Sequence, residues 1–366
     1  MTSNAVNPHL TKFKRHVLFL ISTIIAIINS RIDYLKIKFA VLLTTMEVIS
    51  STWTRFKQNI EEQRYEIPDK VVGSTVYNEP EKVLVDVIFI HGLDGAMNSS
   101  WRQGTWDEDE HQKNIFSDLW KKSRRKKTRK NIEVNNISGC WPIDWIPQDC
   151  QGARVISLDY ITGWLWCPPF IKEREGNNLI TRSDEMIQEL IKLGVGKRPI
   201  VWVGHSKGGL YIKQIIVNAW ESRIKEVERI FRQSRTIAWY GVPHRGSSLS
   251  HYTLPLLRRS VPLSETERNC DFLQNLHRTF LQIIEKENVE IEISSFIETK
   301  CTLVMPFVYW QVIPIESAEP NIGRKYLVPV DHVDICKPRG KNCYLYVGLS
   351  ESIKKLAGQK ELYQNV

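Results

Sequence analysis

The sequence feature that most restricts the fold is the pentapeptide Gly204-His205-Ser206-Lys207-Gly208, which has the pattern Gly-x-Ser-x-Gly. It lies between an apolar run that suits a buried strand and a stretch with helical periodicity. In such a turn the serine takes a strained backbone conformation that lifts its hydroxyl to the C-terminal edge of the sheet, and the two glycines let strand and helix approach closely. We therefore predict that Ser206 is a nucleophile and that Gly204 and Gly208 shape its turn. The alternative is a glycine-rich turn with a bystander serine.

The region around this turn alternates between two patterns. From residue 82 onward, apolar strand-like runs are followed by helical stretches, which is typical of a doubly wound, mostly parallel sheet with helices on both faces. The expected strands span residues 83–90, 154–159, 200–203, 236–240, 289–294 and 310–313, and the expected helices span residues 183–193, 207–220, 272–285 and 350–356. Together with the nucleophile turn, this order predicts an α/β protein with the α/β-hydrolase fold.

A serine hydroxyl needs a base to take its proton, and in this fold the order along the chain is serine, acid, histidine. His332 follows the last expected strand and precedes the terminal helix, so we predict it as the general base, against the alternative of a polar loop residue. The other histidines after the serine are His244, His251 and His277. His244 is expected to shape the pocket wall, and His277 falls within a helical pattern.

The acid that orients the histidine is predicted to be Glu298. It comes at the end of an expected strand and before the segment that leads to His332, so its carboxylate can lie beside the imidazole. Glu316 and Asp271 are rivals for this role, and an exposed glutamate at a strand end is the alternative for Glu298 itself.

Two backbone N–H groups are needed to stabilise the oxyanion that forms during acyl transfer. The N–H of Lys207 follows the nucleophile at a helix N-terminus and is the first predicted donor. The loop after the first central strand supplies the second, the N–H of Leu93, because Gly92 lets this loop approach closely.

Residues 1–80 precede the predicted catalytic domain, residues 81–366, and are interpreted as a targeting or membrane-anchoring segment with a linker. The first 32 residues contain no Asp or Glu and combine basic residues with an apolar stretch at 17–28. That stretch is shorter than the roughly 20 residues of a membrane span. A second apolar stretch at 39–49 would fit an anchor in the membrane interface. A poorly ordered leader or a core helix is the alternative.

The formal net charge of +9 comes mostly from one basic insert, residues 121–130. No module or stacking motif that reads nucleic acid accompanies it, so we predict no nucleic-acid partner. The insert suits contact with anionic lipid headgroups or a solvated loop. The seven cysteines form no CxxC pair or Cys/His cluster, so we expect no metal and no cofactor. The oligomeric state stays open.

Several further motifs accompany the pentapeptide in a fixed order. They are His91-Gly92-Leu93, Trp101-Arg102, Cys140-Trp141-Pro142, Trp145-Ile146-Pro147, Ala153-Arg154-Val155-Ile156, Asp331-His332 and Ile335-Cys336-Lys337-Pro338. With these motifs the chain, from about residue 83 to the end of the terminal helix, resembles the serine-active-site-containing protein family. A more distant likeness is to the inositol deacylases of lipid anchors.

The resemblance implies a lipase-like enzyme associated with mitochondria and the endoplasmic reticulum, with phosphatidylglycerol remodelling and with cholesterol trafficking. It carries over Ser206 as nucleophile and His332 as base, and it places Glu298 at the acidic position. The expected function is thus a serine esterase or lipase that acts on lipid esters at a membrane surface, with residues 164–170 as a candidate lid. A soluble carboxylesterase and a catalytically silent lipid-binding or membrane-tethering protein remain alternatives.

Overall fold

A computed structural model describes residues 72–93, 95–106, 137–161, 166–167, 178–248, 258–287, 289–305 and 308–358. All of them lie in one compact unit, Lys70–Val366. The predicted targeting segment up to residue 71, the basic insert and His251 lie outside the described residues, as does most of the candidate lid. None of the helices that the structure describes is long and apolar enough to span a membrane.

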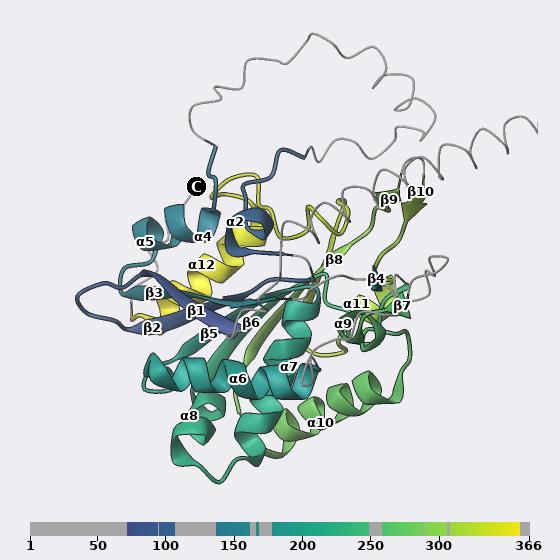
Figure 1. Ribbon diagram of the computed structural model, residues 1–366. Coiled ribbons are helices and arrows are strands. Elements are labelled where there is room, and N and C mark those ends of the chain that lie inside the picture. Colours follow the sequence, from purple (N-terminus) through teal and green to yellow (C-terminus); the bar gives the residue numbers. More distant parts are fainter. Residues whose placement is uncertain are drawn as a thin grey trace, which may run out of the picture. The chain divides into compact units, whose positions relative to one another are not determined.

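The centre of this unit is a seven-stranded sheet with the strand order β1-β3-β2-β5-β6-β8-β11 (Figure 1). The strands are β1 (Val72–Asn78), β2 (Val85–Ile90), β3 (Ala153–Tyr160), β5 (Ile200–His205), β6 (Ser234–Tyr240), β8 (Glu292–Glu298) and β11 (Arg324–Val328). Only β1 runs antiparallel to its neighbour, and the other pairs are parallel. This topology confirms the predicted α/β-hydrolase fold, with the turn at Ser206 directly after the central strand β5.

Helices cover both faces of the sheet (Figure 1). One face carries α6 (Leu179–Lys192), α7 (Lys207–Glu221), α8 (Lys225–Gln233) and α10 (Asp271–Glu287), and the other carries α2 (Met97–Ser100), α4 (Trp141–Asp144), α5 (Ile146–Asp149) and α12 (Tyr344–Leu356). Neighbouring residues of β2 point into different cores, with Ile88 packed in one and Phe89 in the other. Buried on both faces, β2 reads as an apolar run that only Asp86 interrupts.

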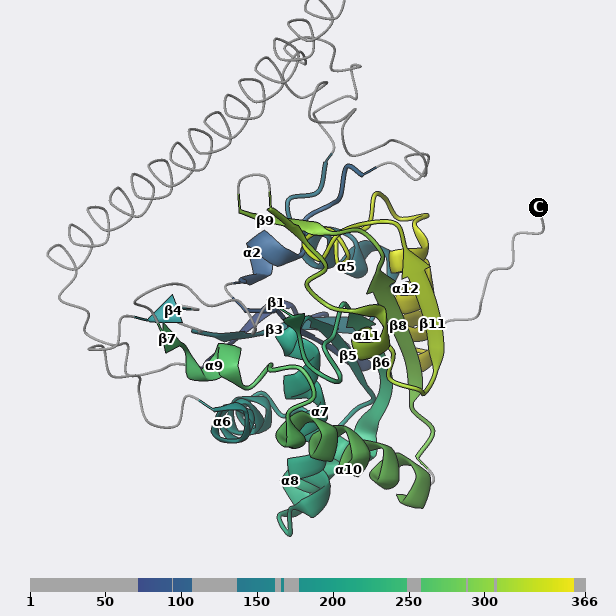
Figure 2. The same cartoon turned by 90° about the vertical axis from the view of Figure 1, so that its right-hand side faces the viewer.

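Smaller elements gather at the edge of the sheet that is formed by the C-terminal ends of the parallel strands, and this edge faces the viewer in Figure 2. They are α9 (Val261–Ser264), α11 (Ile315–Ala318), the hairpin of β9 (Thr302–Met305) with β10 (Val308–Trp310), and the pair of β4 (Trp166–Cys167) with β7 (Arg258–Arg259).

The predicted strand at 310–313 is wrong, and the last strand of the sheet is instead β11. The apolar character of this segment has another cause, because Val312 and Ile313 pack with Ile297 in a small separate cluster. Strand β11 escaped prediction because it is a mostly exposed edge strand that begins with Arg324 and Lys325 and lacks the apolar run of a buried strand.

The sheet also begins before the predicted domain boundary at residue 81, since β1 pairs with β3 from Val72 onward. Most of β1 is half-buried, and its sequence, Val-Gly-Ser-Thr-Val-Tyr-Asn, gives only a weak strand signal. The terminal helix is likewise longer than predicted and begins at Tyr344 rather than at residue 350.

Candidate active site

Ser206 stands on a sharp turn between β5, which ends at His205, and α7, which begins at Lys207. Its φ of 52° lies in a region that side chains other than glycine rarely adopt. Two backbone hydrogen bonds hold the turn, one from Ser206 N to Tyr240 O at 2.9 Å and one from Gly209 N to Ser206 O at 3.1 Å. The chain thus holds the serine in a strained conformation, as a nucleophile turn requires.

The glycines of the pentapeptide leave room for this turn. A Cβ on Gly208 would collide with the carbonyl oxygen of Ile90 on the neighbouring strand. A Cβ on Gly204 would lie 2.6 Å from the side chain of Ile212 and 2.8 Å from the backbone of Gly209. Strand and helix therefore approach each other so closely at these positions that only glycine fits.

Ser206, His332 and Glu298 form one chain of hydrogen bonds. The distance from Ser206 Oγ to His332 Nε2 is 2.9 Å, and His332 Nδ1 lies 2.9 Å from Glu298 Oε1. Glu298 ends β8 and is fully buried, whereas the side chain of His332 is 12% exposed. A carboxylate that accepts from Nδ1–H leaves Nε2 free to accept the serine proton. The structure thus brings the three residues together in the order that acyl transfer needs, and their catalytic roles stay predictions.

The loop that carries His332 is fixed from two sides. The backbone N–H of His332 donates to Thr302 Oγ1 at 3.0 Å, and the backbone carbonyl oxygen of His332 lies 3.0 Å from His205 Nε2. Burial lowers the pKa of His205 to about 3, so this imidazole is neutral and donates its Nε2–H to the carbonyl. His205 is not among the predicted site residues, because it occupies a variable position of the pentapeptide pattern.

Gly241 lies close to both His332 and Glu298, so a side chain at this position should disturb their contact. Its φ is 56°, and a Cβ there would lie 2.8 Å from Glu298 Oε2 and 3.0 Å from His332 Nδ1. Gly241→Ala should lower kcat about 100-fold, because a displacement of about 1 Å in such a relay costs that much. Gly73→Ala is the matched control, since nothing lies within 4 Å of its added methyl group. Equal ester turnover by the two variants would contradict the prediction.

The predicted oxyanion donors belong to two segments next to Ser206. Lys207 is the first residue of α7, and a Cβ on Gly92 would lie 2.9 Å from Ser206 Cβ, so the loop before Leu93 packs directly against Ser206. Leu93, Ser206 and His332 line one cavity of about 320 Å³. The roles of the Leu93 and Lys207 N–H groups stay predictions.

The side chain of Lys207 makes a contact that the sequence analysis missed. It is fully buried, and its Nζ donates to Pro262 O and to Glu265 Oε2, each at 2.8 Å. Glu265 Oε1 also accepts from Leu179 N at 2.7 Å. Glu265 therefore ties the nucleophile turn to the start of α6 and to the segment around α9, a long-range link that no local pattern reveals.

The rival residues lie away from the relay. Glu316 and Asp271 are exposed at the starts of α11 and α10. His277 Nδ1 accepts from Lys213 Nζ at 2.8 Å, and its ring stacks on that of His244 with a centroid distance of 5.6 Å. Both histidines belong to a buried cluster between α7, α10 and the end of β6, and His332 alone of the described candidates bonds to Ser206.

Three buried histidines make the stability of the fold depend on pH. Burial lowers the pKa of His205 and of His277 to about 3 and holds that of His244 well below its ordinary value of 6.5. Each is neutral in the folded state and takes up a proton on unfolding below pH 6.5, so stability rises with pH and is lost as pH falls from 6.5 toward 3. As the pH falls below 6.5, the free energy of unfolding should decrease by about 1.4 kcal/mol per pH unit for each of these histidines.

Urea denaturation at pH 7, 6 and 5 measures this dependence. His244→Phe is the informative variant, because neither ring nitrogen of His244 has a hydrogen-bond partner among the described residues. The variant should reduce the pH dependence by about one proton. An unfolding free energy that stays constant from pH 7 to pH 5 would refute the expectation.

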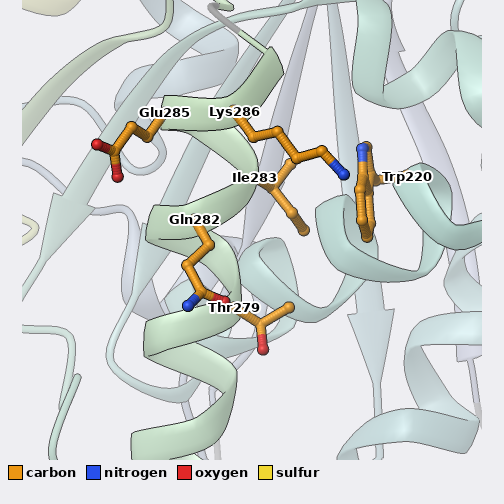
Figure 3. Close-up of a pocket in the computed structure, with 6 residues that line it drawn as sticks. All are labelled: Trp220, Thr279, Gln282, Ile283, Glu285 and Lys286. Atoms are coloured by element: carbon orange, nitrogen blue, oxygen red, sulfur yellow. The ribbon is translucent and has the colours of Figure 1, made fainter.

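A second hollow, of about 580 Å³, lies between α10 and Trp220 near the end of α7 (Figure 3). Lys286 points toward the ring of Trp220, with its Nζ 5.5 Å from the ring centroid. None of the residues that line this hollow is Ser206, His332 or Glu298, and none is a predicted site residue. Its size therefore does not make it the candidate active site.

No family model matches the chain. The chain is 34% identical over 295 residues to Protein SERAC1 of Bos taurus, an alignment that covers 77% of this chain and 41% of that protein. It is 33% identical over 277 residues to Protein SERAC1 of Homo sapiens, over 74% of this chain and 38% of that protein. These proteins are homologues of the chain, and the matching part spans about two fifths of their length.

Among solved structures, the chain is similar to a monoacylglycerol lipase of Paleococcus ferrophilus, with 10% identity and a TM-score of 0.40 over 79% of this chain and 99% of that chain. A likeness this remote carries no argument about the site, which rests on the contacts described above.

Proposed function

We propose that this chain, a homologue of the SERAC1 proteins, is a serine hydrolase of the lipase or esterase type that acts on ester bonds of lipids. The observation that carries the proposal is the hydrogen-bonded relay of Ser206, His332 and Glu298 at a cavity, with Ser206 on a turn at a φ of 52°. Strained backbone of this kind clusters at active sites.

The first half of the proposed reaction forms an acyl-enzyme. Ser206 Oγ bonds to the ester carbonyl carbon while its proton passes to His332 Nε2, and the N–H groups of Leu93 and Lys207 stabilise the oxyanion. The buried carboxylate of Glu298 stabilises the imidazolium. His332 then gives its proton to the leaving alcohol oxygen as the bond between that oxygen and the carbonyl carbon breaks.

The second half releases the acyl group. Water attacks the carbonyl carbon of the acyl–Ser206 ester while His332 takes one of its protons. His332 then returns that proton to Ser206 Oγ as the bond between Oγ and the carbonyl carbon breaks, which releases the acid and restores the serine. If a lipid alcohol takes the place of water, the same steps transfer the acyl group instead of hydrolysing it.

The cavity supports a substrate with an apolar acyl group. Its lining includes the side chains of Leu93, Pro243, Val312, Ile313 and Val333. Apolar walls around a few polar groups suit an acyl chain, which gains free energy when it leaves water. We propose phosphatidylglycerol as the substrate and membranes of mitochondria or the endoplasmic reticulum as the location, from the family resemblance in the sequence.

Turnover of two ester substrates tests the function. The full-length protein should hydrolyse p-nitrophenyl butyrate in solution and should cleave phosphatidylglycerol in vesicles faster, because the second substrate fills the apolar cavity. Faster cleavage of the soluble ester would favour a carboxylesterase. Absence of turnover of either ester by folded protein, together with lipid extraction that Ser206→Ala leaves unchanged, would favour the silent lipid-binding alternative.

A further inference from the structure

Exposed apolar side chains are concentrated around the candidate active site. Among the described residues, ten large hydrophobic side chains are exposed, and seven of them lie on segments at the edge of the sheet where Ser206 stands. Six of these seven, here called the apolar rim, are Ile161, Ile180, Val261, Leu303, Tyr309 and Val333, with exposed fractions between 38% and 51%. The seventh, Ile315, begins α11 and is not counted in the rim.

One side of the apolar rim is attached to the loop of the general base. Val333 follows His332 and lines the cavity. Leu303 and Tyr309 pair across the β9–β10 hairpin, whose first residue, Thr302, accepts the hydrogen bond from His332 N. The chain leaves this hairpin through Val312, which lines the same cavity. The exposed pair therefore stands on a hairpin with both ends at the site.

The other side is attached to the nucleophile turn. Glu265 bonds both Lys207 Nζ and Leu179 N, and Lys207 Nζ also donates to Pro262 O. Ile180 follows Leu179, and Val261 precedes Pro262, so both exposed side chains belong to segments anchored beside Ser206. Exposed apolar surface thus flanks the cavity on the side of the base and on the side of the nucleophile.

We propose that the apolar rim contacts a lipid surface, so that an ester passes from the lipid into the cavity without crossing water. Large apolar patches on a protein surface mark contact sites. A protein partner that covered both sides would close the cavity, whereas a lipid layer is itself the source of substrate. The ring of Tyr309 has an apolar body and a polar hydroxyl, which suits the membrane interface. This inference rests on the proposed function for its purpose, but its first test does not need turnover.

The first test measures insertion directly. The full-length Ser206→Ala protein, with Cys167, Cys270 and Cys301 changed to serine, receives one new cysteine at Leu303 that carries an environment-sensitive nitrobenzoxadiazole label. On phosphatidylcholine vesicles its emission should rise, and brominated lipid should quench it. The same label at Ile224, which is 58% exposed in the connection between α7 and α8, is the matched control and should not respond. Equal responses at the two positions, or none at Leu303, would overturn the proposal.

The second test compares substrates in the active protein. The double variant Leu303→Asp with Tyr309→Asp should cleave vesicle-borne ester at least about tenfold more slowly, since the two side chains lose their apolar burial. Its turnover of p-nitrophenyl butyrate should equal that of the wild type and of Ile224→Asp. A loss on both substrates, or on neither, would overturn the proposal. If the wild-type protein forms dimers, and the double variant abolishes the dimer without changing turnover of the vesicle-borne ester, the apolar rim would be a protein interface instead.

If the wild-type protein hydrolyses no ester, the proposed function fails. The fluorescence test still decides whether the apolar rim contacts a lipid surface, because it uses the inactive Ser206→Ala protein.

Discussion

Ser206→Ala should lower kcat for ester hydrolysis by about 10⁴- to 10⁶-fold and leave the fold intact. The magnitude follows from the relay, because the hydroxyl that lies 2.9 Å from His332 Nε2 is the proposed attacking group and alanine offers no nucleophile in its place. The fold should stay intact, because the substitution removes only one heavy atom and leaves the packing around residue 206 almost unchanged. Turnover of p-nitrophenyl butyrate together with far-ultraviolet circular dichroism measures both expectations.

A second serine in the same cavity provides the control. Ser99 lines the cavity, but its hydroxyl bonds to the backbone of Ala96 at the start of α2 and not to a histidine. Ser99→Ala should therefore keep ester turnover near that of the wild type. Residual activity of Ser206→Ala within tenfold of the wild type would place the nucleophile elsewhere.

Glu298→Gln should lower kcat by about 10⁴-fold while the chain still folds. Glutamine has almost the same shape, but its amide can donate to His332 Nδ1. That contact would favour the tautomer with the proton on Nε2, which faces Ser206. The base would then present a donor where an acceptor is needed. Steady-state kinetics on the soluble ester gives kcat and KM separately, and the loss should appear in kcat.

Two exposed acids serve as controls for Glu298→Gln. Glu316→Gln and Asp271→Asn change the rival residues that the sequence offered, and both should leave kcat unchanged because neither side chain contacts His332. A tenfold or larger loss in either control, with full activity in Glu298→Gln, would assign the acid to a different residue.

The parts of the fold that the sequence predicted are those in which local pattern and buried environment agree. Strands β2 and β5 are buried along almost their whole length, and their nearly continuous apolar runs, Val87 to Ile90 and Ile200 to Val203, report that burial directly. The turn at Ser206 has fixed glycine positions because strand and helix meet there. The predicted order of serine, acid and base also follows from the order of elements in this fold, and the structure places the three side chains in contact.

The parts that the sequence did not predict depend on contacts between distant residues or on exposed positions. Edge strand β1 is half-buried, edge strand β11 is mostly exposed, and neither carries the long apolar run of a buried strand. The bond from His205 to the carbonyl of His332 joins residues 127 positions apart, and the link from Lys207 to Glu265 joins residues 58 apart. Neither contact has a sequence signature, since each depends on which loops meet above the sheet.

The central claim, that Ser206 is an activated nucleophile in contact with His332, has one direct test. The native protein is treated with a fluorophosphonate, digested and analysed by mass spectrometry, and the rate of covalent modification is measured. The phosphonyl group should be found on the peptide that contains Ser206, in a yield near one per chain, and denatured protein should not react. Native, active protein that stays unmodified, or that carries the group on another residue, would contradict the claim.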